Sequence, residues 1–396
     1  MVVALVCGGG NAAHVLAGMG ASRPDTEVRV LTLYADEAER WEKALEGTTL
    51  CVTSKPDKKS YTANPTKVSK DPAKVVPGSD IIMITVPAFA HAQYFSAIKP
   101  HMKEGVVIVG LPGRAGFDFA AHGILGEKAS CCTLISFESL PWACRLTEYG
   151  LSASILGTKQ VLQGAMQLGT PNPPQDPVAM MQRLLGERPV LKTSGHLLSM
   201  TLMAVNSYIH PSIMYGRWHD YDGLPLKDAP LFYQGVDEMA ANMLTKTSDE
   251  GVSVAKEIMK LRPAVDLTTV TPIIEWYQRC YSGEIGDPTN LMTSLHTNKA
   301  YDGLKHPVTE NEDESVVPNF KYRYLTEDLP FGLAVVRGVA EIMKISTPNI
   351  DKVLLWGQEK IGKEYLVQGK LNGKDVCETR APQAYGLTTL DAVLGF

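Results

Sequence analysis

A glycine-rich turn near the start of the chain is the first group of residues with recognisable chemistry. Gly8, Gly10 and Ala13 occupy the small positions of the pattern G-x-G-x-x-G/A, between an apolar run, Val2–Val6, and a helical stretch, Ala12–Met19. Such a turn lets the backbone approach a pyrophosphate, which the N–H groups and dipole of the following helix then stabilise. Because the strand and the helix that the motif needs are both present, a dinucleotide site is favoured over a chance glycine turn.

An acidic residue lies where a dinucleotide site needs one. The second apolar run ends just before Tyr34 and Asp36, about 20 residues past the glycine turn, where a carboxylate accepts hydrogen bonds from the adenosine ribose. Asp36 and Glu37 would repel a 2′-phosphate, and no basic residue occurs between Arg29 and Arg40. We therefore expect NAD (NADH) rather than NADP as the cofactor. The alternative is that both acids only favour the N-terminus of the next helix.

Two further loops follow the third and fourth apolar runs. In open α/β sheets ligands bind beyond the carboxyl ends of the strands, so Val86, Pro87 and the segment 110–113 should border the nicotinamide. Cys144 is also expected close to the cofactor. The predicted cofactor contacts are Gly8, Gly10, Asn11, Ala13, Tyr34, Asp36, Val86, Pro87 and Cys144.

One histidine is distinctive among the nine, because His210 precedes Pro211 inside a helical pattern. Proline removes a helix hydrogen bond and disfavours α geometry in the residue before it, so a kink there could turn the imidazole into a cleft. A kinked core helix with a hydrogen-bonded histidine is the plain alternative. No two histidines are spaced three or four residues apart, so no metal site is expected.

A second dense segment runs from Arg323 to Pro330. Thr326 could cap a helix whose dipole Glu327 and Asp328 complement, with Pro330 in its first turn. That reading leaves Arg323 unexplained unless it forms a salt bridge with one of the acids or binds a substrate anion.

The elements around these residues indicate an α/β N-terminal Rossmann domain with a parallel, doubly wound sheet, followed by an all-α C-terminal domain. We place the division at residues 1–194 and 195–396. The predicted strands are Val2–Val6, Val28–Leu33, Ile81–Val86, Val106–Val109, Thr133–Ser136, Ser154–Leu156 and Val190–Lys192. The predicted helices of the second half are His196–Tyr215, Phe232–Leu261, Pro272–Tyr281, Leu333–Met343 and Ile350–Ile361. The acidic tract Lys305–Lys321 is expected to be a long exposed loop.

Composition narrows the class of protein. The 396 residues include 38 basic and 43 acidic side chains, a net charge of −5 that argues against nucleic acid as a partner. The seven cysteines form no C-x-x-C pair, so we expect neither a disulfide framework nor zinc, and a cytoplasmic location. The N-terminus lacks a basic region before its apolar run, and no run reaches the roughly 18 apolar residues of a membrane span.

Several strings along the whole chain resemble the opine dehydrogenases of marine invertebrates, the group that forms octopine, tauropine, alanopine and strombine. They are Cys7–Asn11, Tyr34–Trp41, Thr85–His91, Leu140–Arg145, His210–Pro211, Arg323–Asp328 and Trp356–Lys363. The resemblance implies an NADH-dependent condensation of a 2-oxo acid, usually pyruvate, with an amino acid. The products are an N-(1-carboxyethyl) amino acid, NAD and water.

The resemblance also implies roles for individual residues and a monomeric enzyme. His210 would be the general acid/base, and Asp328 would orient it and favour the imidazolium. Arg323 resembles the residue that clamps a substrate carboxylate, for which a guanidinium fork is suited. Trp276 resembles an aromatic wall of the amino-acid pocket.

Departures from the family pattern bear on the amino acid. Arg114 replaces Gln, Ser139 replaces a frequent Thr, and Ala204 and Asn206 replace the bulkier Met and Tyr of the octopine enzyme. A cation at Arg114 should disfavour arginine and suit a small donor that ends in carboxylate or sulfonate. We expect taurine, alanine, glycine or β-alanine, bound with help from Arg114, Ser139 and Asn206.

Two other functions share the first domain. One is a 2-oxo or 2-hydroxy acid dehydrogenase similar to the ketopantoate reductases, which would oxidise NADH with pyruvate alone. The other is a non-catalytic dinucleotide sensor, which would bind NADH without turnover.

Overall fold

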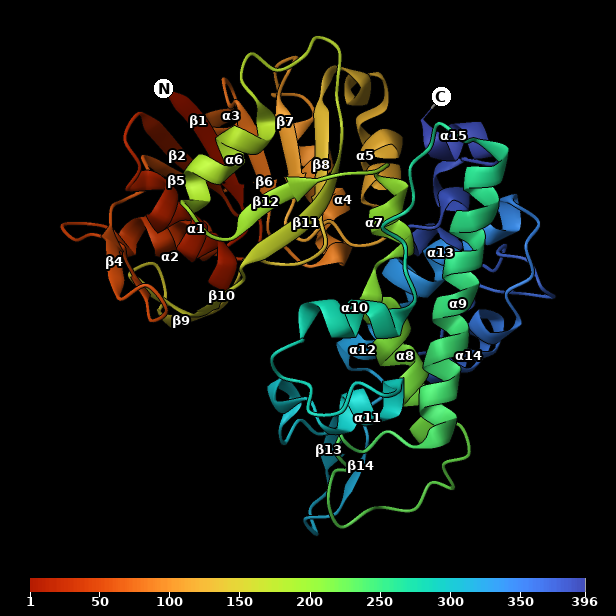
Figure 1. Ribbon diagram of the computed structural model, residues 1–396. Coiled ribbons are helices and arrows are strands. Elements are labelled where there is room, and N and C mark those ends of the chain that lie inside the picture. Colours follow the sequence, from red (N-terminus) through yellow and green to blue (C-terminus); the bar gives the residue numbers. More distant parts are fainter. Residues whose placement is uncertain (396) are drawn as a thin grey trace. The chain divides into compact units, whose positions relative to one another are not determined.

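The computed structural model describes residues 1–395 and separates into two compact units, Met1–Met200 and Thr201–Phe396 (Figure 1). The predicted division after residue 194 lies close to this boundary. Within residues 1–395 no helix has the length and apolar character needed to cross a membrane.

The first unit is built on an eight-stranded sheet in the order β12-β11-β8-β7-β6-β1-β2-β5. Its strands are β1 (Val2–Cys7), β2 (Thr26–Leu31), β5 (Lys67–Ser69), β6 (Ile81–Ile84), β7 (Val107–Gly110), β8 (Thr133–Phe137), β11 (Val161–Gln167) and β12 (Val190–Thr193). All neighbours are parallel except β8 and β11. Strands β6 and β7 are buried at every position, as expected of strands covered on both faces. The predicted Rossmann-type sheet is confirmed.

The α-helices α1 to α6 complete this unit. They are α1 (Asn11–Ala21), α2 (Glu37–Ala44), α3 (Pro72–Val75), α4 (His91–Ile98), α5 (Phe117–Leu125) and α6 (Pro177–Leu185). Helices α1 and α6 pack side by side, as do α4 and α5 (Figure 1). Val2, Ala4 and Val6 join α1 in one apolar cluster, which holds the helix against the strand that precedes it.

A second, four-stranded sheet has the order β4-β3-β10-β9. Its strands are β3 (Cys51–Ser54), β4 (Lys59–Thr62), β9 (Trp142–Glu148) and β10 (Ser152–Thr158). The prediction that Ser154–Leu156 belongs to the main sheet is wrong, because these residues lie in β10 and pair with β3 and β9. Only one face of β9 and β10 is buried, so their alternating sequences resemble loops more than the continuous apolar runs of the main sheet.

The second unit is mainly helical, which confirms the predicted class. Its helices are α8 (Val205–Trp218), α9 (Glu238–Leu261), α10 (Ile273–Cys280), α11 (Leu291–His296), α12 (Arg323–Thr326), α13 (Ala334–Ile342), α14 (Pro348–Lys360) and α15 (Leu390–Leu394), and α7 (Leu198–Leu202) spans the boundary between the units. Helices α8 and α9 run side by side (Figure 1). A Cβ on Gly216 would lie 2.3 Å from Ala240 Cβ, so glycine permits this close crossing.

Two local predictions in this unit are wrong. The predicted loop Lys305–Lys321 contains a hairpin of β13 (Val308–Glu310) and β14 (Val316–Pro318), so the unit is not entirely helical. The predicted helix His196–Tyr215 is interrupted at Ala204, where the Val205 N–H donates to Met203 O at 2.7 Å. Helix α8 then continues through Pro211, so the break comes before the proline and not at it.

Candidate active site

The two glycines of the turn in the first unit have different surroundings, because Gly8 is packed tightly and Gly10 has free space beside it. Gly8 has φ +125°, and a Cβ there would lie 2.9 Å from Val86 Cγ1. Gly10 is the N-cap of α1, and a Cβ there would meet nothing within 4 Å. Ala13 is fully buried against the sheet. The turn is therefore pressed against its own sheet at Gly8 and leaves space at the helix N-terminus, which fits a dinucleotide pyrophosphate.

A buried histidine holds this turn in place. The His14 Nδ1–H donates to Gly10 O at 3.0 Å, and His14 Nε2 accepts the Gly150 N–H at 3.0 Å. The imidazole stacks on Trp41 with centroids 3.5 Å apart. Burial lowers the pKa of His14 to about 4, so the ring is neutral at pH 7. Sequence patterns do not identify this residue, since two of its partners, Trp41 and Gly150, come from distant parts of the chain.

The residues predicted near the adenosine are exposed at the end of β2. Tyr34 is 75% exposed, which leaves an aromatic face for stacking. Asp36 Oδ1 lies 3.2 Å from Arg40 Nε, one helical turn further on, so the carboxylate has a cationic neighbour that the sequence argument did not include. Asn11 Oδ1 accepts the Leu146 N–H at 2.9 Å, so its carbonyl oxygen joins α1 to β9.

The loops predicted near the nicotinamide are held to the sheet by short hydrogen bonds. The Thr85 Oγ1–H donates to Cys7 O at 2.8 Å, and His91 Nε2–H donates to Val86 O at 3.0 Å, which positions Val86 and the exposed Pro87. Cys144 is buried in the apolar cluster, and burial raises the pKa of its thiol to about 11. Cys144 is accordingly a protonated packing residue at pH 7 and no nucleophile.

Two predicted substrate residues also lie in the first unit. Arg114 is half-buried and has φ +65°, a conformation that non-glycine residues seldom adopt. The Ser139 hydroxyl accepts a hydrogen bond from Lys159 Nζ at 2.5 Å, and Lys159 also donates to Leu140 O at 3.1 Å. Lys159 is thus a cation beside a predicted substrate residue, and sequence patterns did not single it out.

The second unit brings His210 and Asp328 together. His210 Nδ1 lies 2.7 Å from Asp328 Oδ2, and the two residues are only 7% and 4% exposed. Because a carboxylate accepts, Nδ1 carries the proton and Nε2 faces the opposite way. Such a buried pair restricts the imidazole to one orientation and one tautomer.

Helix α8 and an irregular turn after α12 position this pair. Asp328 directly precedes a π-helical turn, Leu329–Leu333, that contains Pro330. A Cβ on Gly332 would lie 2.0 Å from Ser207 Oγ, so glycine allows the turn to approach α8 one turn before His210. The expectation that Thr326 caps a helix is wrong. Thr326 ends α12, Asp328 occupies the cap position of the next segment, and its carboxylate contacts His210 instead of a backbone N–H.

Two tyrosines that sequence patterns do not identify complete the environment of His210. His210 Nε2 lies 3.2 Å from the Tyr233 hydroxyl, and the ring of Tyr324 stacks on the imidazole with centroids 3.8 Å apart. Tyr233 in turn stacks on Tyr301 at 3.8 Å. The histidine is therefore contacted by polar groups at both nitrogens and covered by an aromatic ring on one face.

The remaining predicted residues of this unit lie in different surroundings. Arg323 Nη2 is 2.5 Å from the buried Glu327 carboxylate, so Arg323 forms the salt bridge that we considered as one alternative. A guanidinium has five N–H donors, so this salt bridge leaves others that could bind an anion. Trp276 lies on α10, with its ring 5.8 Å from Tyr281. Asn206 is half-buried on α8, four residues before His210 and on the same helix face.

Within residues 1–395 no group of three or more His, Cys, Asp or Glu side chains could hold a metal ion. A dinucleotide turn in an α/β unit and a buried histidine–carboxylate pair in a helical unit define a nicotinamide-dependent oxidoreductase.

Comparisons with known proteins identify the family. Residues 193–361 match the family model described as NAD/NADP octopine/nopaline dehydrogenase, alpha-helical domain. The chain is 51% identical to tauropine dehydrogenase of Arabella iricolor over 397 residues, covering 100% of both proteins. It is 48% identical to octopine dehydrogenase of Pecten maximus, covering 98% of both proteins. A solved octopine dehydrogenase structure with NADH and L-arginine superposes with a TM-score of 0.96, covering 100% of this chain and 98% of that one.

The chain belongs to the opine dehydrogenase family. It is an NAD-dependent oxidoreductase that acts on a CH–NH group, and the predicted family, fold and cofactor are confirmed. The two alternative functions, a ketopantoate-reductase-like dehydrogenase and a non-catalytic sensor, are not supported, because the full-length relatives of this chain are named as opine-forming dehydrogenases.

Proposed function

We propose that this enzyme condenses pyruvate reductively with a small amino acid, and that taurine, alanine, glycine or β-alanine is preferred to arginine. A solved octopine dehydrogenase structure contains NADH with pyruvate, which supports the 2-oxo acid. The full-length relative at 51% identity is a tauropine dehydrogenase, which supports a small donor.

The buried His210–Asp328 pair is the observation that carries the mechanism. Addition of the amine to the pyruvate carbonyl gives a carbinolamine, and loss of water from it requires a proton on its oxygen. His210 gives this proton from Nε2, and Asp328 stabilises the imidazolium before the transfer. NADH, when bound, supplies the hydride that reduces the resulting imine. Each condensation consumes one proton, because the product amine is protonated and water is released.

Positive charge near Ser139 favours a donor that ends in an anion. Lys159 donates directly to Ser139, and Arg114 lies in the loop after β7, the parallel neighbour of the strand β8 that ends just before Ser139. Two cations in this region favour a carboxylate or sulfonate tail and oppose a guanidinium. Arg323 serves as the clamp for a substrate carboxylate, Trp276 forms an aromatic wall, and Asn206 leaves more space than a tyrosine would.

The cofactor contacts belong to the same proposal. The Gly8–Ala13 turn and Asn11 hold the pyrophosphate end, Tyr34 and Asp36 hold the adenosine, and Val86 and Pro87 border the nicotinamide. We also place the enzyme in the cytoplasm as a monomer. Within residues 1–395 none of the seven cysteines forms a disulfide bond, which suits a reducing compartment.

A donor panel tests the proposal. NADH oxidation is followed with pyruvate and each of taurine, alanine, glycine, β-alanine and arginine, and again with pyruvate alone. We expect one small donor to give the highest kcat/KM and pyruvate alone to give almost none. Arginine ranking first would refute the donor assignment, whereas fast turnover without any amine would refute the condensation.

A further inference from the structure

The hydrogen bonds of His210 hold its two nitrogens but only weakly fix the plane of its ring. Nδ1 bonds to Asp328 at 2.7 Å, and Nε2 bonds to the Tyr233 hydroxyl at 3.2 Å. Hydrogen bonds in the plane of a ring tolerate a broad range of angles, so the ring can tilt about the line through its nitrogens. The bond at Nε2 must also be given up when this nitrogen transfers its proton to the substrate. The direction of that transfer therefore depends on what packs against the ring's faces.

The ring of Tyr324 lies on one face of the imidazole. The two rings are nearly parallel, with centroids 3.8 Å apart and planes inclined by 20°. The fully buried Phe232 packs against both, with its centroid 5.8 Å from that of His210 and 4.7 Å from that of Tyr324. A ring stacked in this way opposes any tilt of the imidazole, because a tilt would bring the two rings into collision.

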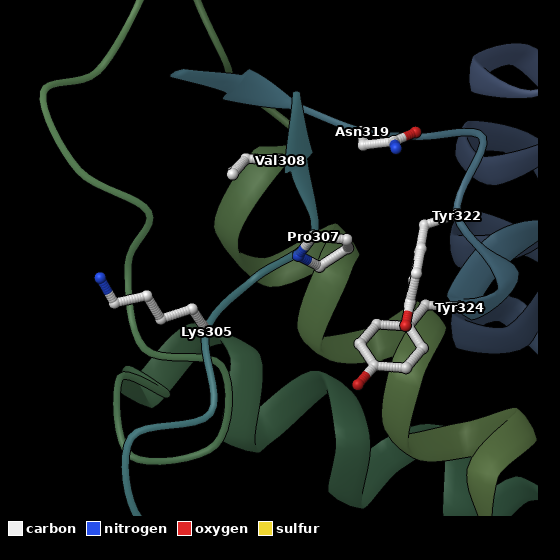
Figure 2. Close-up of a pocket in the computed structure, with 6 residues that line it drawn as sticks. All are labelled: Lys305, Pro307, Val308, Asn319, Tyr322 and Tyr324. Atoms are coloured by element: carbon white, nitrogen blue, oxygen red, sulfur yellow. The ribbon is translucent and has the colours of Figure 1, made fainter. Parts of the chain in front are cut away.

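Tyr324 also lines a pocket at the surface of the second unit. The pocket has a volume of about 280 Å³, and its lining consists of Lys305, Pro307, Val308, Asn319, Tyr322 and Tyr324. Figure 2 shows the ring of Tyr324 among these residues. Lys305 and Tyr322 are exposed, so water has access to the pocket. His210 is not one of the lining residues, so this water meets the ring of Tyr324 and not the imidazole.

We propose that Tyr324 is a positioning residue for His210, whose ring fixes the plane of the imidazole and covers it against the water of this pocket. The role rests on the proposed acid/base function of His210, through which Tyr324 acts. The face of an aromatic ring carries partial negative charge, so the stack also attracts the positive imidazolium more than the neutral ring. All of these effects come from the ring of Tyr324, and none requires its hydroxyl.

The test compares two substitutions of Tyr324. Tyr324→Leu removes the aromatic face, so we expect kcat for condensation to fall about tenfold, the size of a cation–π contact in a desolvated site, with smaller changes in the KM for pyruvate. Tyr324→Phe loses only the hydroxyl and should recover most of that loss. An equal loss of kcat in both variants, or no loss in Tyr324→Leu, would overturn the proposal.

Tyr322→Leu is the matched control. Tyr322 lines the same pocket, and its ring meets that of Tyr324 edge-on, with centroids 5.0 Å apart and planes inclined by 85°. The change alters the wall of the pocket but leaves the stack on His210 in place, so kcat should stay near wild type. A loss of kcat as large as that of Tyr324→Leu would assign the effect to the pocket and overturn the role of the stack.

Chemical labelling of His210 measures the cover directly and needs no turnover. Diethyl pyrocarbonate acylates accessible, unprotonated imidazole nitrogens, and peptide mass spectrometry reports the rate at each histidine. We expect His210 to be labelled several-fold faster in Tyr324→Leu than in wild type or Tyr324→Phe, while the fully buried His14 is labelled equally slowly in all three. Equal rates at His210 in Tyr324→Leu and wild type would overturn the proposal.

NADH affinity and far-UV circular dichroism check that each variant is folded, and Tyr324→Met takes the place of Tyr324→Leu if the leucine variant does not fold. If His210→Asn keeps full activity, the proposed acid/base role fails and the positioning role fails with it. If His210→Asn is inactive while Tyr324→Leu behaves like wild type, only the positioning role fails.

Discussion

The molecule contains two buried histidines that make similar contacts, although one has a structural role and the other a proposed catalytic role. His14 in the first unit and His210 in the second each have both ring nitrogens in hydrogen bonds and one face stacked on an aromatic ring. The partners of His14 are two backbone groups, whereas those of His210 are a carboxylate and a hydroxyl. Burial and geometry alone therefore do not distinguish a structural histidine from a chemical one; the charge and mobility of the partners do.

The difference follows from what each partner can accept. Backbone groups cannot take up or release protons, and burial lowers the pKa of His14 to about 4, so this ring remains neutral and joins Gly10 to Gly150. Asp328 supplies a negative charge that stabilises an imidazolium, and the Tyr233 hydroxyl can donate or accept. The first arrangement keeps the His14 ring neutral, whereas the second provides the groups that the proposed proton transfer at His210 requires.

The largest expected effect comes from His210→Asn. Removing the proposed acid/base should lower kcat for condensation by on the order of 10² or more, while NADH binding, which we place on the first unit, stays near normal. Steady-state rates and fluorescence titration with NADH measure the two quantities. Equal turnover in variant and wild type would remove His210 from the mechanism.

Asp328→Asn should have the next largest effect. The amide keeps the shape but removes the charge that stabilises the imidazolium, so we expect kcat to fall by roughly 10- to 100-fold. Rates of the matched variant Glu327→Gln, which changes the neighbouring carboxylate, serve as a comparison. A larger loss of kcat in Glu327→Gln than in Asp328→Asn would show that Asp328 is not the carboxylate that assists His210.

His14→Gln should affect stability and leave chemistry nearly intact. Loss of hydrogen bonds to buried backbone groups is expected to cost about 1 to 3 kcal/mol in the free energy of unfolding. The free energy of unfolding of the first unit, measured by urea denaturation, and the kcat of the folded enzyme test this prediction. A loss of kcat without a loss of stability would make His14 resemble His210 and remove the contrast.

The same variant tests the pH dependence. In wild type, unfolded His14 binds a proton below its ordinary pKa of 6.5, but folded His14 does so only near about 4. Its contribution is therefore fully present above pH 6.5 and is lost as the pH falls toward about 4. We expect His14→Gln to flatten this part of the stability curve, and an unchanged slope would contradict the assignment.

The smallest expected effect concerns donor choice. Arg114→Gln removes one cation from the first unit, so kcat/KM for arginine relative to taurine should increase by about tenfold. Lys159→Gln is a matched change of a second cation near Ser139. If neither variant changes the donor ranking, charge in this region does not select the amino acid.

The sequence predicts best those parts of the fold whose pattern is local. The strands β6 and β7 are continuous apolar runs because both faces are buried, and the Gly8–Ala13 turn has its required strand and helix beside it. Strand β9 was not predicted, and β10 was predicted only at Ser154–Leu156 and in the wrong sheet, because half of the residues in these strands face outward. The hairpin β13–β14 was missed because it lies in an acidic tract.

The chemical site was less accessible to sequence patterns. His210 and Asp328 are 118 positions apart, so only the family resemblance linked them. Tyr233 and His14 carry no motif, and their importance comes from which groups the fold places against them. Nothing in periodicity or spacing contains that information.

The pH dependence of both reaction directions tests the central claim, that His210 gains and loses a proton in turnover. We predict that kcat for condensation falls as the pH rises, because the acid form is lost, while kcat for opine oxidation rises over the same range. Both trends should disappear in His210→Asn. Parallel profiles in the two directions, or opposite profiles that survive in His210→Asn, would contradict the account.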